Sequence, residues 1–344
     1  MIDENVSHAK KHFVGLFVKQ TKPIPSEAYD IYWHFAAERQ HIFFDRFENK
    51  KYPWTTNAVL RQYKFTNVYR ASDRVSQYLI RNVIYTGDTE PANVFFRIIL
   101  FKIFNRISTW ESLTTAFGEI AWNTYSFEQY DKVLSDLLSR GIPIYSGAYI
   151  MASGKREFGH MRKHRNHLAL LEWMMKDRLH EKLEAANSLA QVYHLFRAYP
   201  TVGEFLAYQY TIDVNYSTIT NFSEMDFVKA GPGARRGVEK CFASFGNYTY
   251  EDIIKMMTYQ QEDEFARLGI DFQTLWGRPL QLIDCQNIFC EVDKYTRVAH
   301  PELNCKLERK RIKQQFSIQG KPSINYFFPP KWNINPIIEN RKCL

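Results

Sequence analysis

The chain has 344 residues, of which 45% are hydrophobic and 16% aromatic, and its formal net charge is +8. This length and hydrophobic content suffice for one large domain or two. The positive charge favours anionic partners, of which nucleic acid is the first candidate. From residue 306 to 344 there are nine Lys or Arg and two Glu, a net +7. We therefore predict a basic C-terminal tail over 301–344, which either binds a polyanion or is solvated.

Several classes of protein are excluded. Five cysteines without a CxxC pair and a polar, acidic N-terminus predict a cytoplasmic protein with free thiols. The most apolar run, 94–104, is too short and too charged to span a membrane. The sequence has no P-loop and no zinc-deaminase motif, so ATP chemistry and deamination are not expected. His160 and His164 have helical metal-ligand spacing, but we predict neither a metal nor a cofactor.

The first predicted elements are an N-terminal arm over 1–25 and a helix that begins near Ser26. Apolar residues then recur with a helical period as far as Phe47, and Arg39 lies on or beside the polar face of that helix. The run KKYPWTTN predicts a loop over 50–57, because proline disfavours helix at the residue before it.

The next stretch, 61–79, interleaves aromatic and basic residues in RQYKFTNVYRASDRVSQYL. Such residues stack nucleobases and bind phosphates. The same residues at helical spacing also form a core face with a charged back, and the sequence leaves both interpretations open.

Further helices are predicted over 94–110, 126–140 and 167–199. Between the last two, GIPIYSGAYIMASG over 141–154 is either a short strand pair or a loop that reaches a site. The run KREFGHMRKHR over 155–165 contains five Lys or Arg, and it could lie along a DNA backbone.

The central stretch, 199–237, has a glycine-marked turn at each end, YPTVG and AGPGARRG. A tight turn before a helix presents backbone N–H groups that suit a phosphate. The predicted phosphate contacts are Gly203, Gly233, Arg235 and Arg236. Asp226 lies between the turns, where an acid could meet the sugar of a bound nucleotide. The alternative is two ordinary turns and a solvent-exposed aspartate.

A polar stripe is predicted on the helix within 277–299. Asp284, Asn287, Glu291 and Lys294 fall at i, i+3, i+7 and i+10, which is one helix face. This stripe either lines a site or is an ion-pair face.

The hairpin YPTVG resembles the LPGVG hairpin of the helix-hairpin-helix DNA glycosylases. In that superfamily a catalytic Asp follows about twenty residues later, and Asp226 lies 23 residues after Gly203. Thr201 replaces the middle glycine, and Phe205 stands where some members carry a lyase lysine. The resemblance thus implies a monofunctional enzyme with water as the nucleophile, and Asp213 and Asp284 are the alternative acids.

Most of the chain, residues 30–299, resembles a clade near that superfamily. The motifs are WHFAAERQ, PWT, KFTNVYRASDR, FKIFNR, DFVKAGPGARRG and DxQNxFCExDKY. The clade comprises the α-glutamyl/putrescinyl thymine pyrophosphorylases, the helical domain of the 5-hydroxymethyl-dU DNA kinases, and anti-phage DNA glycosylases. The resemblance makes Arg39, Trp54, Thr55, Asn67, Arg70, Asp73 and Arg74 site candidates, and their individual roles do not follow from it. We predict a base pocket of Trp54, Thr55, Asn67, Tyr69, Asp73, Asn287 and Glu291. We predict DNA contacts from Arg39, Arg70, Arg74, Gly203, Gly233, Arg235, Arg236 and Lys294.

We therefore expect a mainly α, helix-hairpin-helix DNA-glycosylase-like body over 26–300 with a central cleft. It would form one body or two lobes, 26–190 and 191–300.

The expected function is excision of a flipped, hypermodified pyrimidine from double-stranded DNA, in the context of phage DNA or defence against it. Asp226 would stabilise positive charge on the deoxyribose and orient a water, with its pKa lowered by Arg235 or other donors. The alternatives are a modified-DNA-binding module without chemistry and a base-hypermodification enzyme that acts on thymine derivatives.

Overall fold

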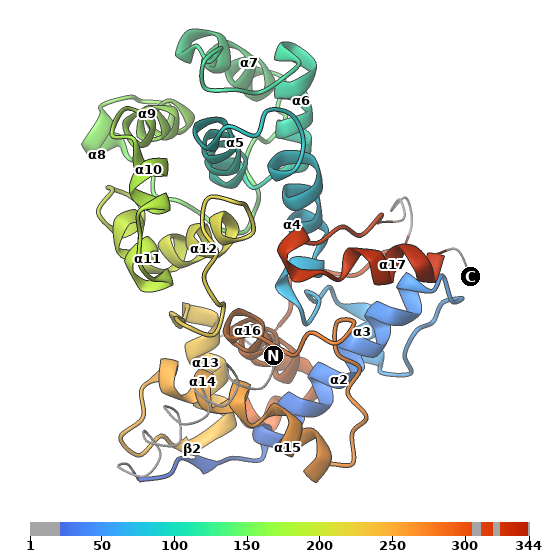
Figure 1. Cartoon of the computed structure of the whole chain (residues 1–344). Coiled ribbons are helices and arrows are strands. Elements are labelled where there is room, and N and C mark those ends of the chain that lie inside the picture. Colours follow the sequence, from blue (N-terminus) through green and yellow to red (C-terminus); the bar gives the residue numbers. More distant parts are fainter. Residues whose placement is uncertain (1–20, 305–310, 319–323, 343–344) are drawn as a thin grey trace. The chain divides into compact units, whose positions relative to one another are not determined.

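The computed structural model describes residues 21–304, 311–318 and 324–342, and most of these residues are helical (Figure 1). The predicted mainly α fold is confirmed. Among the described residues, sheet is limited to the antiparallel pair β1 (Ile24–Pro25) and β2 (Phe242–Ser244). No helix in these ranges combines the length and the apolar character that a bilayer crossing requires.

The chain folds into two compact units, each built from two separated stretches. Unit 1 comprises residues 1–70 and 228–323, and unit 2 comprises residues 71–227 and 324–344. The chain therefore passes between the units three times. The boundaries predicted from the sequence for the arm, the body and the tail stay a prediction.

Unit 1 is organised around two long helices. These are α2 (Ala28–Phe47), which follows the predicted start at Ser26, and α16 (Leu282–Ala299). Its other helices are α3 (Ala58–Gln62), α13 (Pro232–Cys241), α14 (Tyr250–Tyr259), α15 (Gln261–Arg267) and η3 (Pro301–Asn304). The turn η1 (Arg70–Ser72) stands where the chain enters unit 2.

Close packing of α13 on α16 depends on two glycines. A Cβ atom on Gly237 would lie 2.1 Å from the backbone oxygen of Phe289, and one on Gly233 would lie 2.9 Å from Cys290 Sγ. A spacing of four residues puts both glycines on one face of α13, so its backbone can approach α16 closely. Two glycines of AGPGARRG, the motif that was predicted to suit a phosphate, thus have a packing role.

Unit 2 surrounds the apolar helix α5 (Pro91–Phe104), whose residues from Asn93 onwards are all buried. Around α5 lie α9 (Lys163–Lys176), α10 (Leu179–Glu184) and α12 (Glu204–Asn215), all in contact with it. The remaining helices are α4 (Arg74–Leu79), η2 (Ile80–Ile84), α6 (Ile107–Phe117), α7 (Phe127–Ser139), α8 (Lys155–Phe158), α11 (Leu189–Arg197), η4 (Pro330–Trp332) and α17 (Asn335–Lys342).

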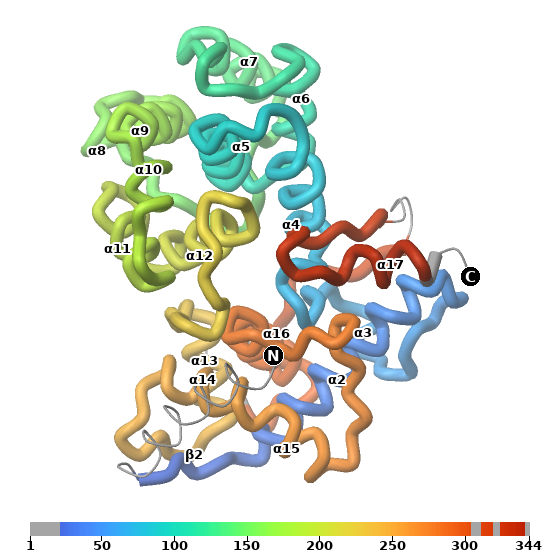
Figure 2. The backbone as a smooth tube through the Cα atoms, in the orientation of Figure 1, coloured from blue at the N-terminus to red at the C-terminus, as the bar shows by residue number. Residues whose placement is uncertain are grey.

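The described parts of the predicted basic tail pack on the body, as the backbone trace allows the reader to follow (Figure 2). Residues 311–318 pair with the first stretch of unit 1, where Lys64 N donates to Gln314 O over 3.0 Å. In unit 2, Lys331 Nζ donates to the carbonyls of Ser217 and Thr220 at 3.0 and 2.8 Å. Four cations of the predicted tail lie outside the described residues: Lys306, Arg309, Lys310 and Lys321.

Candidate functional site

In unit 1 the irregular segment 65–70, here called the clamped segment, is held by side chains from two helices. From α2, Arg39 donates through Nε and Nη2 to Thr66 O at 3.2 and 3.1 Å, and through Nη2 to Asn67 Oδ1 at 3.1 Å. Arg39 is 6% exposed, so these bonds form where water cannot replace them. Arg39, predicted to contact DNA, thus fixes the conformation of the segment that holds two predicted pocket residues.

The predicted polar stripe of α16 faces the same segment. Glu291 Oε2 accepts from Thr66 N at 2.9 Å and from Lys294 Nζ at 2.6 Å. Asn287 Nδ2 donates to Thr66 Oγ1 at 3.4 Å, and Lys294 Nζ lies 4.6 Å from the centre of the Phe65 ring. The stripe therefore contains an ion pair, as the ion-pair interpretation predicts. It also binds a backbone segment more than 200 residues earlier in the chain.

Asp284 anchors the other end of the clamped segment. Its Oδ1 accepts from Arg70 N at 2.8 Å, and its Oδ2 accepts from Gln281 N at 3.0 Å in a capping box at the start of α16. Both oxygens of this alternative acid thus bind backbone amides. Arg70 and Asn67 are themselves buried.

Tyr69 lies in the core of unit 1. It is 1% exposed and donates from its hydroxyl to Arg278 O at 2.7 Å. Burial raises the pKa of Tyr69 well above its usual value. A phenol with these contacts is a structural anchor in this conformation.

The loop that carries Trp54 and Thr55 is attached to α2. Trp54 Nε1 donates to Lys50 O at 2.8 Å, and the Arg46 guanidinium lies 5.3 Å from the centre of its ring. Thr55 Oγ1 donates to the carboxylate of Glu38. Trp54 and Thr55 are both partly exposed.

Three residues in or next to this loop, Asn57, Glu38 and Tyr295, were not among the predicted site residues. Asn57 Nδ2 donates to Tyr295 OH at 2.8 Å and to Glu38 Oε2 at 3.1 Å, which links α2, the loop and α16. Glu38 precedes Arg39 in WHFAAERQ, and Tyr295 ends the DxQNxFCExDKY motif. Their place inside these motifs was the available signal.

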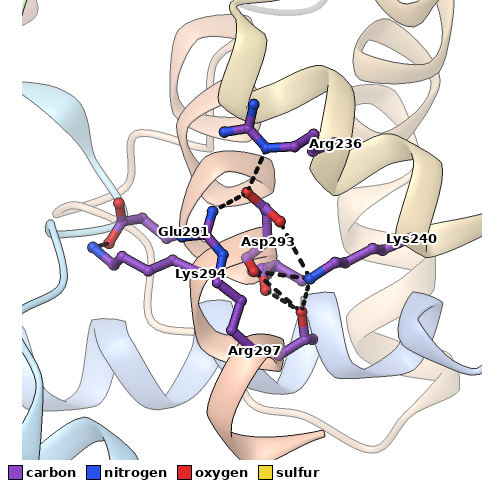
Figure 3. Close-up of polar contacts among 8 residues, drawn as sticks. Arg236, Lys240, Glu291, Asp293, Lys294 and Arg297 are labelled. Carbon is purple, nitrogen blue, oxygen red and sulfur yellow. Dashed lines mark hydrogen bonds and ion pairs between the residues drawn. The ribbon is translucent and has the colours of Figure 1, made fainter. Parts of the chain in front are cut away.

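The arginines of AGPGARRG have partners within unit 1. Arg235 Nε donates to Ala230 O at 3.1 Å, and its guanidinium lies 5.6 Å from the centre of the Tyr250 ring. Arg236 Nε donates to Asp293 Oδ2 at 3.1 Å (Figure 3). Both arginines therefore contact other residues of unit 1 through Nε, and both are partly exposed.

Asp293 is the centre of a cationic cluster that the sequence reasoning did not find (Figure 3). Besides Arg236, its carboxylate is met by Lys240 Nζ at 3.2 Å and by Arg297 Nη2 at 2.5 Å. Burial opposes ionisation here, but Arg297, Lys240 and Arg236 outweigh it and lower the pKa of Asp293. Three cations around one buried carboxylate leave an excess of positive charge between α13 and α16.

The predicted helix-hairpin-helix is present in unit 2, as α11, the turn 198–203 and α12. Arg197 Nη1 donates to Val202 O at 2.6 Å across the turn. Thr201 has a φ of 65°, a left-handed conformation that glycine adopts without strain, which explains why a glycine is usual there. Gly203 is exposed, and a Cβ atom on it would meet nothing within 4 Å.

Asp226 follows this hairpin in unit 2 and lies at the surface. Its backbone N–H donates to Ser223 O at 3.1 Å, and no described residue donates to its carboxylate. Partial loss of surrounding water raises the pKa of Asp226. The prediction that Arg235 or other donors lower this pKa was therefore wrong, because desolvation is the dominant influence.

The other predicted site residues of unit 2 are Asp213, Asp73 and Arg74. Asp213, the alternative acid, is completely buried and lies 3.3 Å from Lys102 Nζ. Asp73 directly precedes α4 and is partly exposed, while Arg74 is exposed as the first residue of that helix. The structure thus gathers the clamped segment and the α16 stripe in unit 1, whereas Asp226 and Asp213 belong to unit 2. Among the described residues there is no group of three His, Cys, Asp or Glu that could hold a metal ion.

The chain was compared with known proteins. A 5-hmdU DNA kinase of Bacillus phage SP10 is 28% identical over 291 residues, which are 78% of this chain and 44% of that protein. The chain thus spans less than half the length of this relative. No solved structure matches the chain. Residues 26–305 match the family described as "5-hmdU DNA kinase, helical domain". This match covers more than half of the chain and includes both the clamped segment and α16, so the chain belongs to the helical-domain family of the 5-hmdU DNA kinases.

Proposed function

We propose that this chain recognises DNA that contains 5-hydroxymethyl-deoxyuridine or a base derived from it, and that it serves the hypermodification of such DNA. The observation that carries this proposal is the family match over residues 26–305, together with a relative that is named for 5-hmdU DNA. The net charge of +8 suits a polyanionic partner.

The clamped segment supports recognition because its shape is fixed before any ligand arrives. Arg39, Glu291 and Asp284 bind its backbone groups, and all three are buried residues. Prior ordering of this kind reduces the entropy that a binding site loses on association. We propose that the partly exposed Trp54 supplies the stacking face and that Asn287 supplies the polar contact for the base.

The test is a binding series with one duplex sequence in three forms, which contain thymine, 5-hydroxymethyluracil and a bulkier derivative of it. We expect tighter, salt-sensitive binding to the modified forms. Equal affinity for all three would overturn the proposal. Mass spectrometry of the recovered DNA separates binding without chemistry from a change of the base.

Base excision is the second candidate function, favoured by the hairpin between α11 and α12 with the surface carboxylate of Asp226 downstream. In this reaction the C1′–N1 bond breaks and water adds at C1′. The Asp226 carboxylate would stabilise positive charge on the sugar and orient that water. Release of free base with formation of abasic sites would support excision, and Asp226→Asn should abolish both. If Asp226→Asn releases base as fast as the native protein does, Asp226 has no catalytic role.

A further inference from the structure

Unit 2 exposes two large apolar side chains on either side of a basic run. Ile150 is 74% exposed and Met161 is 79% exposed, which makes them the most exposed large hydrophobic residues that the structure describes. Between them lies α8, Lys155–Phe158, whose flanking glycines Gly154 and Gly159 both have left-handed backbones. Singly exposed apolar side chains are common on protein surfaces, but these two flank one run that is rich in cations.

One buried side chain forms hydrogen bonds to both ends of the segment 153–160. Asn166, which is fully buried on α9, donates through Nδ2 to Ser153 O at 2.9 Å and to His160 O at 3.0 Å. Its Oδ1 accepts from His160 N at 2.9 Å. Met161 directly follows one tied residue, and Ile150 lies three residues before the other.

A second buried residue fixes the loop that leads to Ile150. His167 Nε2 donates to Ala152 O over 2.7 Å, and its Nδ1 accepts from Tyr145 OH over 2.8 Å. Burial lowers the pKa of His167 to about 4, so the ring is neutral at neutral pH and can accept at Nδ1. Ile150 and Met161, here called the two tips, thus lie next to backbone segments that Asn166 and His167 of α9 hold in place.

The exposed charges between and beside the two apolar residues are mostly positive, with Glu157 as the acid of α8. Lys155, Arg156 and Arg162 are exposed, and none of them forms an ion pair with a described residue. The neighbouring cations are occupied, since Arg165 Nε binds Asp131 Oδ1 at 2.8 Å and Lys163 Nζ lies 4.8 Å from the centre of the Tyr145 ring. Cations without partners suit phosphates, which lie on both sides of every base step.

We propose that Ile150 and Met161 enter a base step of duplex DNA while Lys155, Arg156 and Arg162 bind the flanking phosphates. Proteins that unstack a duplex insert apolar wedges of this kind, and two narrow tips among cations match that task. The surface also lies beside the hairpin, because a Cβ atom on Gly154 would be 3.4 Å from Thr201 Cγ2. This inference rests on the proposed recognition of DNA.

The test uses the full chain and a duplex with 2-aminopurine at the modified position or beside it. The native protein should raise the 2-aminopurine fluorescence, because the base is unstacked. The double substitution Ile150→Ala with Met161→Ala should lose this rise and bind about tenfold more weakly, with an unchanged salt dependence. Lys155→Gln, Arg156→Gln and Arg162→Gln should each lower the slope of log K against log salt by about 1.

The controls separate this inference from the proposed function. Leu138→Ala, at another exposed apolar residue of unit 2, should change neither signal, and Met161→Leu should retain the fluorescence rise. If the native protein prefers modified DNA but gives no rise, or if the double substitution retains it, the wedge is wrong and recognition stands. If no duplex binds, both proposals fail. If the double substitution abolishes binding only to vesicles of anionic phospholipid, the surface contacts membranes and the inference is overturned.

Discussion

Lys102 Nζ lies 3.3 Å from Asp213 Oδ2 in the interior of unit 2, where both side chains are almost completely withdrawn from water. Lys102 also donates to Asn105 Oδ1 at 2.8 Å, and its ammonium lies 4.4 Å from the centre of the Tyr149 ring. The pair links α5, which lies in the stretch predicted as a helix, with α12, the helix that follows the hairpin.

Breaking this pair from one side should destabilise unit 2 strongly. Lys102→Met or Asp213→Leu leaves an uncompensated buried charge, which costs about 3–5 kcal/mol. The double substitution Lys102→Met with Asp213→Leu removes both charges and should recover most of that loss. Denaturant unfolding of the four proteins measures the coupling. Equal losses for the single and double variants would show that packing, and not charge, sets the stability here.

Loss of the clamp should loosen the segment 65–70 and weaken recognition of the modified base. Arg39→Met removes the donors to Thr66 O and Asn67 Oδ1 and should lower the free energy of unfolding by about 1–3 kcal/mol. Arg61→Gln, at an exposed position on α3, is the matched control. Hydrogen exchange at Thr66 and calorimetric unfolding report the change. Unaltered exchange in the Arg39 variant would contradict the role of the clamp.

The contact between α13 and α16 should not tolerate one methyl group. Gly237→Ala places a Cβ atom against the backbone of Phe289, and backbone atoms cannot rotate away as a side chain can. We expect a loss of about 3 kcal/mol or more in the free energy of unfolding. Gly147→Ala, where a Cβ atom meets nothing within 4 Å, should have little effect. Thermal unfolding compares the two, and similar melting temperatures would refute the close approach.

Unit 2 should lose stability in mild acid because of His167. The folded pKa of about 4 lies below the ordinary value of 6.5, so the unfolded chain takes up the proton first. The free energy of unfolding should therefore fall as the pH drops from 6.5 towards 4, by about 3 kcal/mol in total. His167→Gln cannot titrate and should lack this part of the pH dependence. A variant that follows the native curve over this range would exclude His167 as its source.

Local patterns predicted the elements well, because periodicity and capping act within a few residues. Ser126 caps α7 through Gln129 N, and Gly141 follows its end, as the sequence indicates. The stripe of α16 was also found. The sequence did not predict what the stripe binds, because the partner of Glu291 is a backbone amide 225 residues away. No local pattern encodes such a pairing.

The same limit applies to charges and glycines whose partners lie on other elements. Lys102 seemed only to interrupt an apolar run, because its partner Asp213 lies on another helix. Gly233 and Gly237 belong to the motif for which phosphate contacts are predicted, and the sequence did not show that their crowded neighbours are Cys290 and Phe289 of α16. In each case the deciding contact is between elements that are distant in the sequence.

The return of residues 324–342 to unit 2 bears on how this family can be recombined. Lys331 supplies the donors for two carbonyls just beyond α12, and Trp332 packs edge-on against Tyr216 with ring centres 5.7 Å apart. A chimera that exchanges only residues 71–227 between relatives would therefore lack the C-terminal stretch, 324–342, that packs on this part of unit 2. Transplants should carry both stretches.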